Sequence, residues 1–165
     1  MNVVGKDFGA KKIFLPQVML SAEAMREAFI KIKERIPSDS VSNKGTIVIA
    51  TVKGDIHDLG KNIVSALLEN NGFKVIDLGK DIDKEEIIKA AIDNKADMIG
   101  LCSLMTTTIT QIDEVIAELN KSEYSTKVMI GGAVVTQEYA DNVGADAYAP
   151  DGVEAVEIAK KLINK

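Results

Sequence analysis

The fold of this chain is decided by the stretch Thr46-Ile47-Val48-Ile49-Ala50-Thr51-Val52. It is a short, β-branched, apolar run, and comparable runs follow at 74–78, 98–102, 127–130 and 147–149. Amphipathic segments with helical spacing separate them, at 59–70, 83–94, 108–120, 136–142 and 153–163. Short apolar strands that alternate with helices are typical of a parallel sheet covered on both faces. The pattern predicts an α/β fold, a doubly wound parallel sheet of five strands.

The first 40 residues have a different character and predict helices rather than strands. A helix is expected to begin at Pro16, because proline is favoured at the first helical position. Its apolar residues recur at steps of three and four and form one stripe, made of Val18, Ala22, Met25, Phe29, Ile32 and Ile36. A polar, turn-forming linker follows at 37–43. We therefore expect an N-terminal helical segment, residues 1–40, and an α/β domain, residues 44–165.

The composition excludes several classes of protein. A chain of 165 residues, 46% hydrophobic and 27% charged, suits one compact domain with a short additional element. Its net charge of −5 and its lack of a basic run interleaved with aromatic residues argue against a nucleic-acid partner. No apolar run approaches the roughly 20 residues that span a bilayer, and no signal peptide is evident. We expect a cytoplasmic protein without membrane partners.

His57 is the only histidine and lies in the loop after the first predicted strand. Asp55 precedes it by two residues and Gly60 follows it by three. An imidazole binds a metal through one ring nitrogen, and a carboxylate that accepts the proton of the other nitrogen fixes the tautomer. One histidine and one cysteine, Cys102, are too few for a protein zinc site. His57 is therefore either a solvated loop residue or a ligand to a metal whose other ligands come from elsewhere.

The predicted topology brings the His57 loop close to two other unusual loops. Doubly wound sheets bind ligands at the carboxyl ends of their strands, where the strand order reverses. In the flavodoxin-like (Rossmann-like) order this point lies between the first and third strands, so residues 102–108 are expected to meet His57. Gly131 and Gly132 follow the fourth strand beside them. Two glycines there indicate either an ordinary turn or the close approach of a bulky ligand to the backbone.

These residues resemble the cobalamin-binding domain of corrinoid methyltransferases. Its first signature, Asp-x-His-x-x-Gly, supplies the lower axial ligand of cobalt and is matched by Asp55, His57 and Gly60. Its second, Ser-x-Leu followed by hydroxyl residues, and its third, a Gly-Gly pair, are matched at Leu104, Thr106, Thr108, Gly131 and Gly132. The first serine of the second signature is Cys102 here, which is a weaker hydrogen-bond partner. Cys102 is also interpreted as a small buried residue in preference to a reactive thiol.

The N-terminal residues resemble half of the four-helix cap that precedes this domain in methionine synthase. Phe8 and Leu15 match cap residues that cover the upper face of the corrin, although both also suit the core of a helical bundle. Half a bundle with a long apolar stripe leaves much apolar surface uncovered. We therefore predict self-association, as a homodimer, through the N-terminal helices.

The resemblance implies a cobalamin cofactor bound base-off and His-on, with its benzimidazole displaced and His57 on the cobalt. A chain of this kind is a carrier subunit without catalytic residues of its own. It takes a methyl group from a substrate-specific methyltransferase to an acceptor methyltransferase that uses a thiol or a folate. The run Met105-Thr106-Thr107-Thr108 resembles the corrinoid proteins of methylamine and methanol systems more than it resembles methionine synthase.

Three alternatives share parts of the pattern. A cobalamin-binding subunit of an adenosylcobalamin-dependent mutase has the same histidine motif, but the cap around Phe14-Leu15-Pro16 disfavours it. A cobalamin-dependent sensor is disfavoured by the lack of a DNA-binding segment. A flavodoxin-like phosphorelay or flavin domain does not account for the His57 loop.

Overall fold

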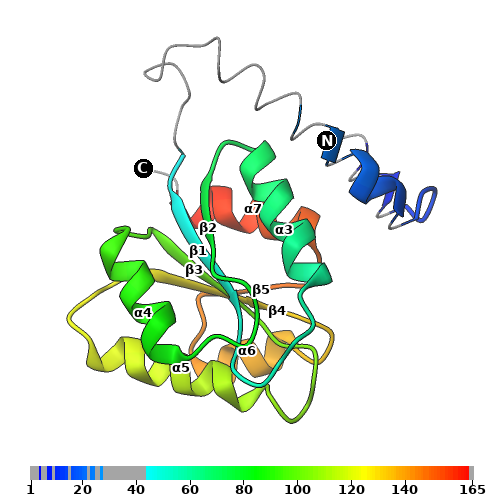
Figure 1. Ribbon diagram of the computed structural model, residues 1–165. Helices are drawn as coiled ribbons and strands as arrows, with labels where there is room; N and C mark the ends of the chain where they lie inside the picture. The colour runs from blue at the N-terminus through cyan, green and yellow to red at the C-terminus, as the bar shows by residue number, and fades with distance from the viewer. Residues whose placement is uncertain are drawn as a thin grey trace.

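The computed structural model describes residues 4, 7–8, 10–14, 16–21, 23–24, 27 and 44–163. From residue 44 onward, strands and helices alternate, as Figure 1 shows. In chain order they are β1 (Thr46–Thr51), α3 (Leu59–Asn70), β2 (Lys74–Asp77), α4 (Lys84–Asp93), β3 (Met98–Cys102), α5 (Thr110–Lys121), β4 (Lys127–Gly131), α6 (Gln137–Val143), β5 (Ala147–Ala149) and α7 (Gly152–Ile163). Each lies within two residues of the segment predicted for it.

The five strands form one parallel sheet in the order β2-β1-β3-β4-β5, which confirms the flavodoxin-like prediction. The chain first places β2 on one side of β1 and then crosses to place β3 on the other side. All six residues of β1 are buried, because helices cover both faces of this inner strand. The strand order therefore reverses at β1 and β3, and the loops that follow these two strands lie next to each other.

Alternate residues of each strand enter two separate hydrophobic cores. Ile47 of β1 packs in the core under α3 and α7, whereas Val48 packs in the core under α4, α5 and α6. This alternation follows from the two-residue period of a strand. Figure 1 shows the two groups of helices on opposite faces of the sheet. The two cores hold the carboxyl ends of the strands in a fixed register.

Described residues of the N-terminal segment lie against the α3 and α7 face. Val18 is buried, and Phe8 and Val18 face Ile63 and Leu67 of α3 around a small cavity of about 20 Å³. The rest of the predicted apolar stripe, from Ala22 to Ile36, lies outside the described residues. Within the described ranges, no helix combines the length and the apolar character needed to cross a bilayer.

Helix α5 begins two residues later than predicted, at Thr110 instead of Thr108. Thr108 lies in the preceding turn, where its hydroxyl bonds the carboxylate of Asp55 at 3.2 Å. The backbone N–H groups of Thr108, Gln111 and Ile112 bond carbonyl oxygens three residues earlier, which is a tighter turn than an α-helix, so the regular helix begins only at Thr110.

Gly132 is required because the chain after β4 passes very close to the loop after β3. A Cβ atom built on Gly132 would lie 1.9 Å from the carbonyl oxygen of Ser103, and the φ angle of Gly132 is +129°. Gly144, at the end of α6, also has a positive φ of +76°, but no atom lies within 4 Å of its added Cβ. A side chain at Gly132 would therefore cause both steric crowding and backbone strain, whereas a side chain at Gly144 would cause backbone strain alone.

We predict that Gly132→Ala lowers the free energy of unfolding by about 3 kcal/mol or more, because overpacking adds to backbone strain. Gly144→Ala, which adds strain alone, is expected to cost about 1–2 kcal/mol. Urea denaturation followed by circular dichroism measures both values. Equal losses in the two variants would contradict the close approach of Gly132 to Ser103.

Candidate functional site

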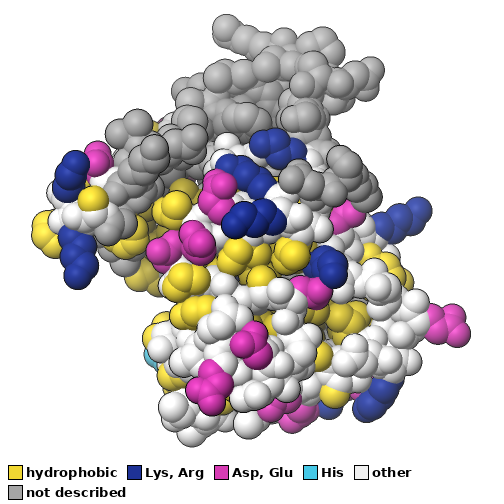
Figure 2. Space-filling model, turned by 180° about the vertical axis from the view of Figure 1, so that it is seen from behind, with side chains coloured by type: hydrophobic (Ala, Val, Ile, Leu, Met, Phe, Trp, Pro, Cys, Tyr) yellow, Lys and Arg dark blue, Asp and Glu magenta, His cyan; other side chains and the backbone are white. Residues whose placement is uncertain are grey.

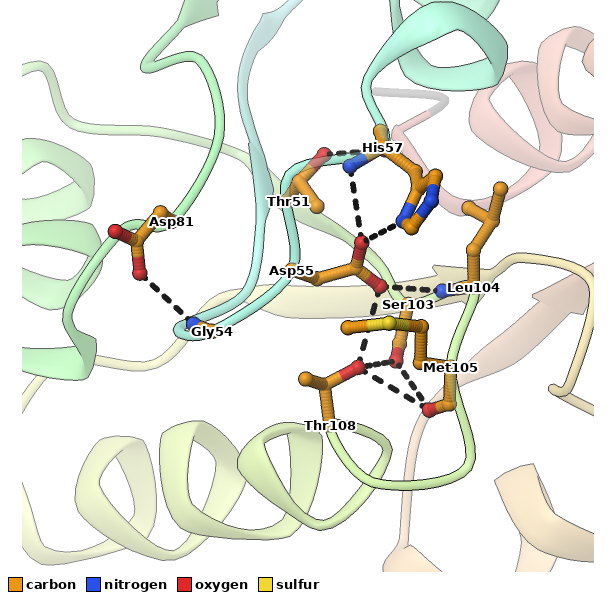
Figure 3. Close-up of polar contacts among 9 residues, drawn as sticks. All are labelled: Thr51, Gly54, Asp55, His57, Asp81, Ser103, Leu104, Met105 and Thr108. Carbon is orange, nitrogen blue, oxygen red and sulfur yellow. Dashed lines mark hydrogen bonds and ion pairs between the residues drawn. The ribbon is translucent and has the colours of Figure 1, made fainter.

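Asp55 is the centre of the polar cluster at the point where the strand order reverses (Figure 3). Its side chain is fully buried in the loop after β1. One carboxylate oxygen accepts hydrogen bonds from the backbone N–H of His57 at 3.0 Å and lies 2.8 Å from Nδ1 of the same residue. The other accepts from the backbone N–H of Leu104 at 2.7 Å and from the Thr108 hydroxyl at 3.2 Å. Asp55 therefore joins the loops that follow β1 and β3.

The hydrogen bonds keep Asp55 ionised in spite of its burial. Burial alone raises the pKa of this carboxyl. The donors from Leu104, His57 and Thr108 outweigh that effect and hold the pKa below its ordinary value of 3.8. At neutral pH Asp55 is therefore an anion that only accepts hydrogen bonds.

This anion decides the tautomer of His57. Because Asp55 has no proton to donate, the Nδ1 atom of the imidazole carries the hydrogen in their 2.8 Å contact. The Nε2 atom is then left with a free electron pair in the neutral ring. The His57 side chain is 51% exposed, and Figure 2 shows this single histidine at the edge of the molecule beside hydrophobic side chains. His57 is therefore prepared to donate one nitrogen to a metal from outside the protein.

Ser103 extends the cluster by a second hydroxyl, which the sequence analysis missed. Its Oγ lies 2.9 Å from Oγ1 of Thr108, and both hydroxyls are buried. With Ser103 donating to Thr108 and Thr108 donating to Asp55, the two hydroxyls support the negative charge of Asp55. The signal for it in the sequence is the serine directly after Cys102, one position beyond the serine of the motif.

Two large apolar side chains flank the imidazole in the sequence and stay exposed. Ile56 is 63% exposed and Leu59 is 49% exposed. Exposed side chains of this size beside a polar site indicate a surface that another molecule covers.

A cavity of about 420 Å³ opens at the same edge of the sheet. It lies between the carboxyl ends of β3, β4 and β5 and the first turns of α3 and α7. Six of the predicted site residues line it, namely Phe8, Gly60, Cys102, Leu104, Gly131 and Gly132. Its volume is in the range of small-molecule sites, and its wall is mostly apolar with several glycines. The cavity can therefore hold a flat organic group close to the backbone.

The remaining predicted site residues lie elsewhere. Asp55, His57 and Thr108 belong to the polar cluster outside the cavity wall and connect to it through Leu104, which belongs to both. Thr106 is exposed in the loop after β3. Leu15 lies outside the described residues. The structure thus brings most of the predicted residues into two adjoining parts, a histidine cluster and an apolar cavity.

Lys61 is a buried charge in the cavity wall that the sequence analysis also missed. Its side chain is 1% exposed, and its Nζ lies 2.5 Å from both carboxylate oxygens of Asp77 and 2.7 Å from the side-chain oxygen of Asn62. Ser65, one turn along α3, donates to the same carboxylate at 2.9 Å. The spacing of Lys61, Ser65 and Leu68 along one face of α3 was a signal for this arrangement. The ion pair ties the first turn of α3 to the end of β2.

The described residues do not form a complete metal site of their own. Across the described part of the chain, no group of three or more His, Cys, Asp and Glu residues is placed to hold an ion. His57 supplies a single nitrogen, so a metal at this position must bring its other ligands with it. A metal held in an organic ring, with a further group that enters the apolar cavity, fits both parts of the site.

Comparisons with known proteins relate this chain to cobalamin-binding proteins. The family described as the B12 binding domain matches residues 45–159, and a second family with the same description matches residues 1–33. Dimethylamine corrinoid protein 3 of Methanosarcina mazei is 48% identical to this chain over 167 aligned positions, which cover 99% of each protein.

Solved structures give the same result. A chain of the methanol:cobalamin methyltransferase complex of Methanosarcina barkeri superimposes with a TM-score of 0.87 at 37% identity, over 98% of this chain. This chain spans 62% of the length of that one. The monomethylamine corrinoid protein of the same organism superimposes with a TM-score of 0.68 at 34% identity, over 98% of this chain and 77% of that one. With the match to the B12 binding domain over most of its length, the chain belongs to the B12-binding corrinoid proteins of methyltransferase systems.

Proposed function

We propose that this protein binds a corrinoid base-off and His-on and carries a methyl group between a substrate-specific methyltransferase and an acceptor methyltransferase. One observation carries the proposal: the Nε2 atom of the only histidine is open, while its Nδ1 atom is tied to a buried carboxylate beside an apolar cavity. When bound, the corrinoid supplies a cobalt ion that accepts and releases the methyl group.

The protein's own residues hold and orient that group. His57 would hold the cobalt through Nε2, and Asp55 keeps the ring in the orientation and tautomer that this requires. Ile56 and Leu59, which precede and follow His57 in the sequence, add exposed apolar surface that a corrin ring could cover. The buried hydroxyls of Thr108 and Ser103 maintain the charge of Asp55 when the environment of His57 changes.

The cavity suits the displaced nucleotide tail of the cofactor. Gly60, whose added Cβ atom would meet no atom within 4 Å, leaves room for a planar base near the backbone, and Gly131 and Gly132 also line the cavity. Phe8 lies at the wall of this cavity, so we propose that it faces the tail and not the upper face of the corrin, where the resemblance had assigned it. We propose that Leu15 and other residues of the cap cover the upper face. The cap, residues 1–40, is proposed as a unit distinct from the α/β domain.

The partners follow from the relatives. The methanol:cobalamin methyltransferase complex supports a methyltransferase partner, and the dimethylamine corrinoid relatives support a methylated amine as the donor. Self-association through the N-terminal helices stays a prediction. Phe14 and Leu20, 68% and 73% exposed, are apolar residues that such an association would cover.

The presence of a single histidine makes the ligand assignment directly testable. The protein is produced with nitrogen-15 histidine and loaded with cobalamin in its paramagnetic, one-electron-reduced form. We expect each cobalt line of the electron paramagnetic resonance spectrum to change from a triplet to a doublet on labelling, because only His57 then supplies the axial nitrogen. The His57→Ala variant is expected to lose this coupling and to bind cobalamin about 10–100-fold more weakly.

A triplet that persists after labelling would show that the cofactor's own base remains on the cobalt. That result would overturn the base-off, His-on proposal. Thermal unfolding of the cofactor-free His57→Ala variant serves as the control for folding.

The only cysteine reports on the cavity. Burial is the main influence on the Cys102 thiol, and together with the negative charges of Asp77 and Asp55 it outweighs the opposing charge of Lys61, raising the pKa from 9.0 to about 12. Ellman's reagent at pH 8 is therefore expected to react with the folded protein at least about a hundredfold more slowly than with the unfolded protein, because the thiolate is the reactive form. Bound cobalamin should slow the reaction further by covering Cys102. If Cys102 reacts quickly with Ellman's reagent and bound cobalamin does not slow the reaction, the nucleotide tail of the cofactor does not lie in this cavity.

The carrier role is tested by methyl transfer. The protein, loaded with reduced cobalamin, is incubated with isotopically labelled dimethylamine, monomethylamine or methanol and with the methyltransferase specific for each donor. We expect protein-bound label with a methylated amine, and its release when an acceptor methyltransferase and a thiol are added. Loaded protein that takes label from none of the donors would contradict the carrier role.

A further inference from the structure

We infer that Asp81, in the loop after β2, is a positioning residue that holds His57 in its ligand orientation by clamping the backbone of Asp55. The inference rests on the proposed function, since it concerns the presentation of the same histidine. It adds a third loop to a site that otherwise consists of the loops after β1 and β3.

Asp81 makes two hydrogen bonds to the dipeptide that precedes the His57 turn. Its carboxylate accepts from the backbone N–H of Gly54 at 2.8 Å, as Figure 3 shows. Its own backbone N–H donates to the carbonyl oxygen of Asp55 at 3.0 Å. One residue therefore fixes both ends of the Gly54–Asp55 unit and closes a ring with it.

Gly54 is a conformationally free point in this loop. Its φ of +80° is a conformation that glycine adopts freely but can also leave freely. A Cβ atom added to Gly54 would lie 3.3 Å from the methyl group of Thr108, so the turn runs close to the loop after β3. A rotation at Gly54 would move Asp55 relative to Thr108.

The clamp complements the hydrogen bonds of the Asp55 side chain. Leu104 and Thr108 both donate to the Oδ2 atom of Asp55. These bonds fix the end of the side chain, but they do not fix the backbone dihedral angles of the loop. Asp81 restrains the main chain from the opposite side. His57, two residues later, takes its orientation from the carboxylate oxygen that is held between these two restraints.

Asp81 lies at the surface and does not contribute to the hydrophobic core. Its side chain is 47% exposed, and its φ of +58° belongs to the left-handed region that aspartate and asparagine tolerate best among non-glycine residues. Lys53 lies 3.6 Å from its carboxylate. The hydrogen bond from Gly54 and the nearby Lys53 charge together keep its pKa below the ordinary value, although partial desolvation opposes them.

Asp83 offers a matched control in the same loop. It has the same charge, lies 3.2 Å from the same Lys53 ammonium and is 58% exposed. It precedes α4 but makes no side-chain hydrogen bond to cap that helix. Asp83→Ala therefore removes a carboxylate and a Lys53 contact without touching the clamp.

The experiment compares Asp81→Ala, Asp81→Asn and Asp83→Ala in the full chain. The tautomer of His57 is read from the two ring-nitrogen shifts of histidine-labelled, cofactor-free protein above pH 8, where one histidine gives one pair of signals. Binding of hydroxocobalamin is measured by titration. We expect Asp81→Ala to shift the ring from the Nδ1–H form towards the mixture found in free imidazole and to weaken binding about tenfold. Asp81→Asn, whose side-chain oxygen still accepts from Gly54, and Asp83→Ala should stay within about twofold of the unmodified protein.

The result that overturns the inference is an Asp81→Ala variant whose ring shifts and affinity equal those of Asp83→Ala. If Asp81→Ala does not fold, Asp81→Gly replaces it, because glycine accepts a φ of +58° without strain. Loss of folding in both variants, with Asp83→Ala folded, would also overturn it and make Asp81 a purely structural residue. Failure of the unmodified protein to bind cobalamin would refute the proposed function instead, while the ring shifts would still decide the role of Asp81.

Discussion

The contact between the Asp55 carboxylate and Nδ1 of His57 is the interaction on which the site depends. A buried carboxylate is stable only when donors surround it, and Asp55 receives them from its own loop and from the loop after β3. Because these donors keep it ionised, it must accept from Nδ1, and the opposite nitrogen of the ring is left open. The electrostatics of one buried oxygen pair thus determine which atom of His57 faces outward.

The sheet makes this contact possible by bringing separate loops to one place. The reversal of strand order at β1 and β3 lays the His57 loop beside residues 103–108. The same edge holds the cavity under β3, β4 and β5, so the candidate metal ligand His57 and an apolar cavity adjoin. Neither part explains a corrinoid alone. A lone histidine suits many metals, and an apolar cavity suits many ligands, but their connection through Leu104 suits a metal that arrives inside a large cofactor.

Much of the fold and part of the site could be predicted because their signals are local. The β-branched run at 46–52 and the similar runs after it predicted every strand of the described residues, and the spacing of Asp55 and His57 predicted their contact.

Ser103 and the Lys61–Asp77 pair were missed for a common reason. Which of two adjacent residues, Cys102 or Ser103, turns its side chain towards Thr108 depends on the pleat at the end of β3. A lysine in an amphipathic helix is expected at the surface, and only the packing of α3 against β2 brings Asp77 beside Lys61. Gly132 was open to two interpretations, and the close approach of Ser103 accounts for it without a ligand.

The sequence by itself determined the class of fold, the strand positions and the choice of His57 as the candidate metal ligand. These follow from periodicity and from the presence of a single histidine, which are properties of the chain read in order. Only the tertiary structure decided which groups surround that side chain: the second hydroxyl, the buried ion pair, the position of Phe8 at the cavity and the two bonds of Asp81 to the His57 loop. The physical reason is that hydrogen bonds between distant segments depend on distances of a few ångströms, and those distances exist only after the loops after β1, β2 and β3 have been packed at one edge of the sheet.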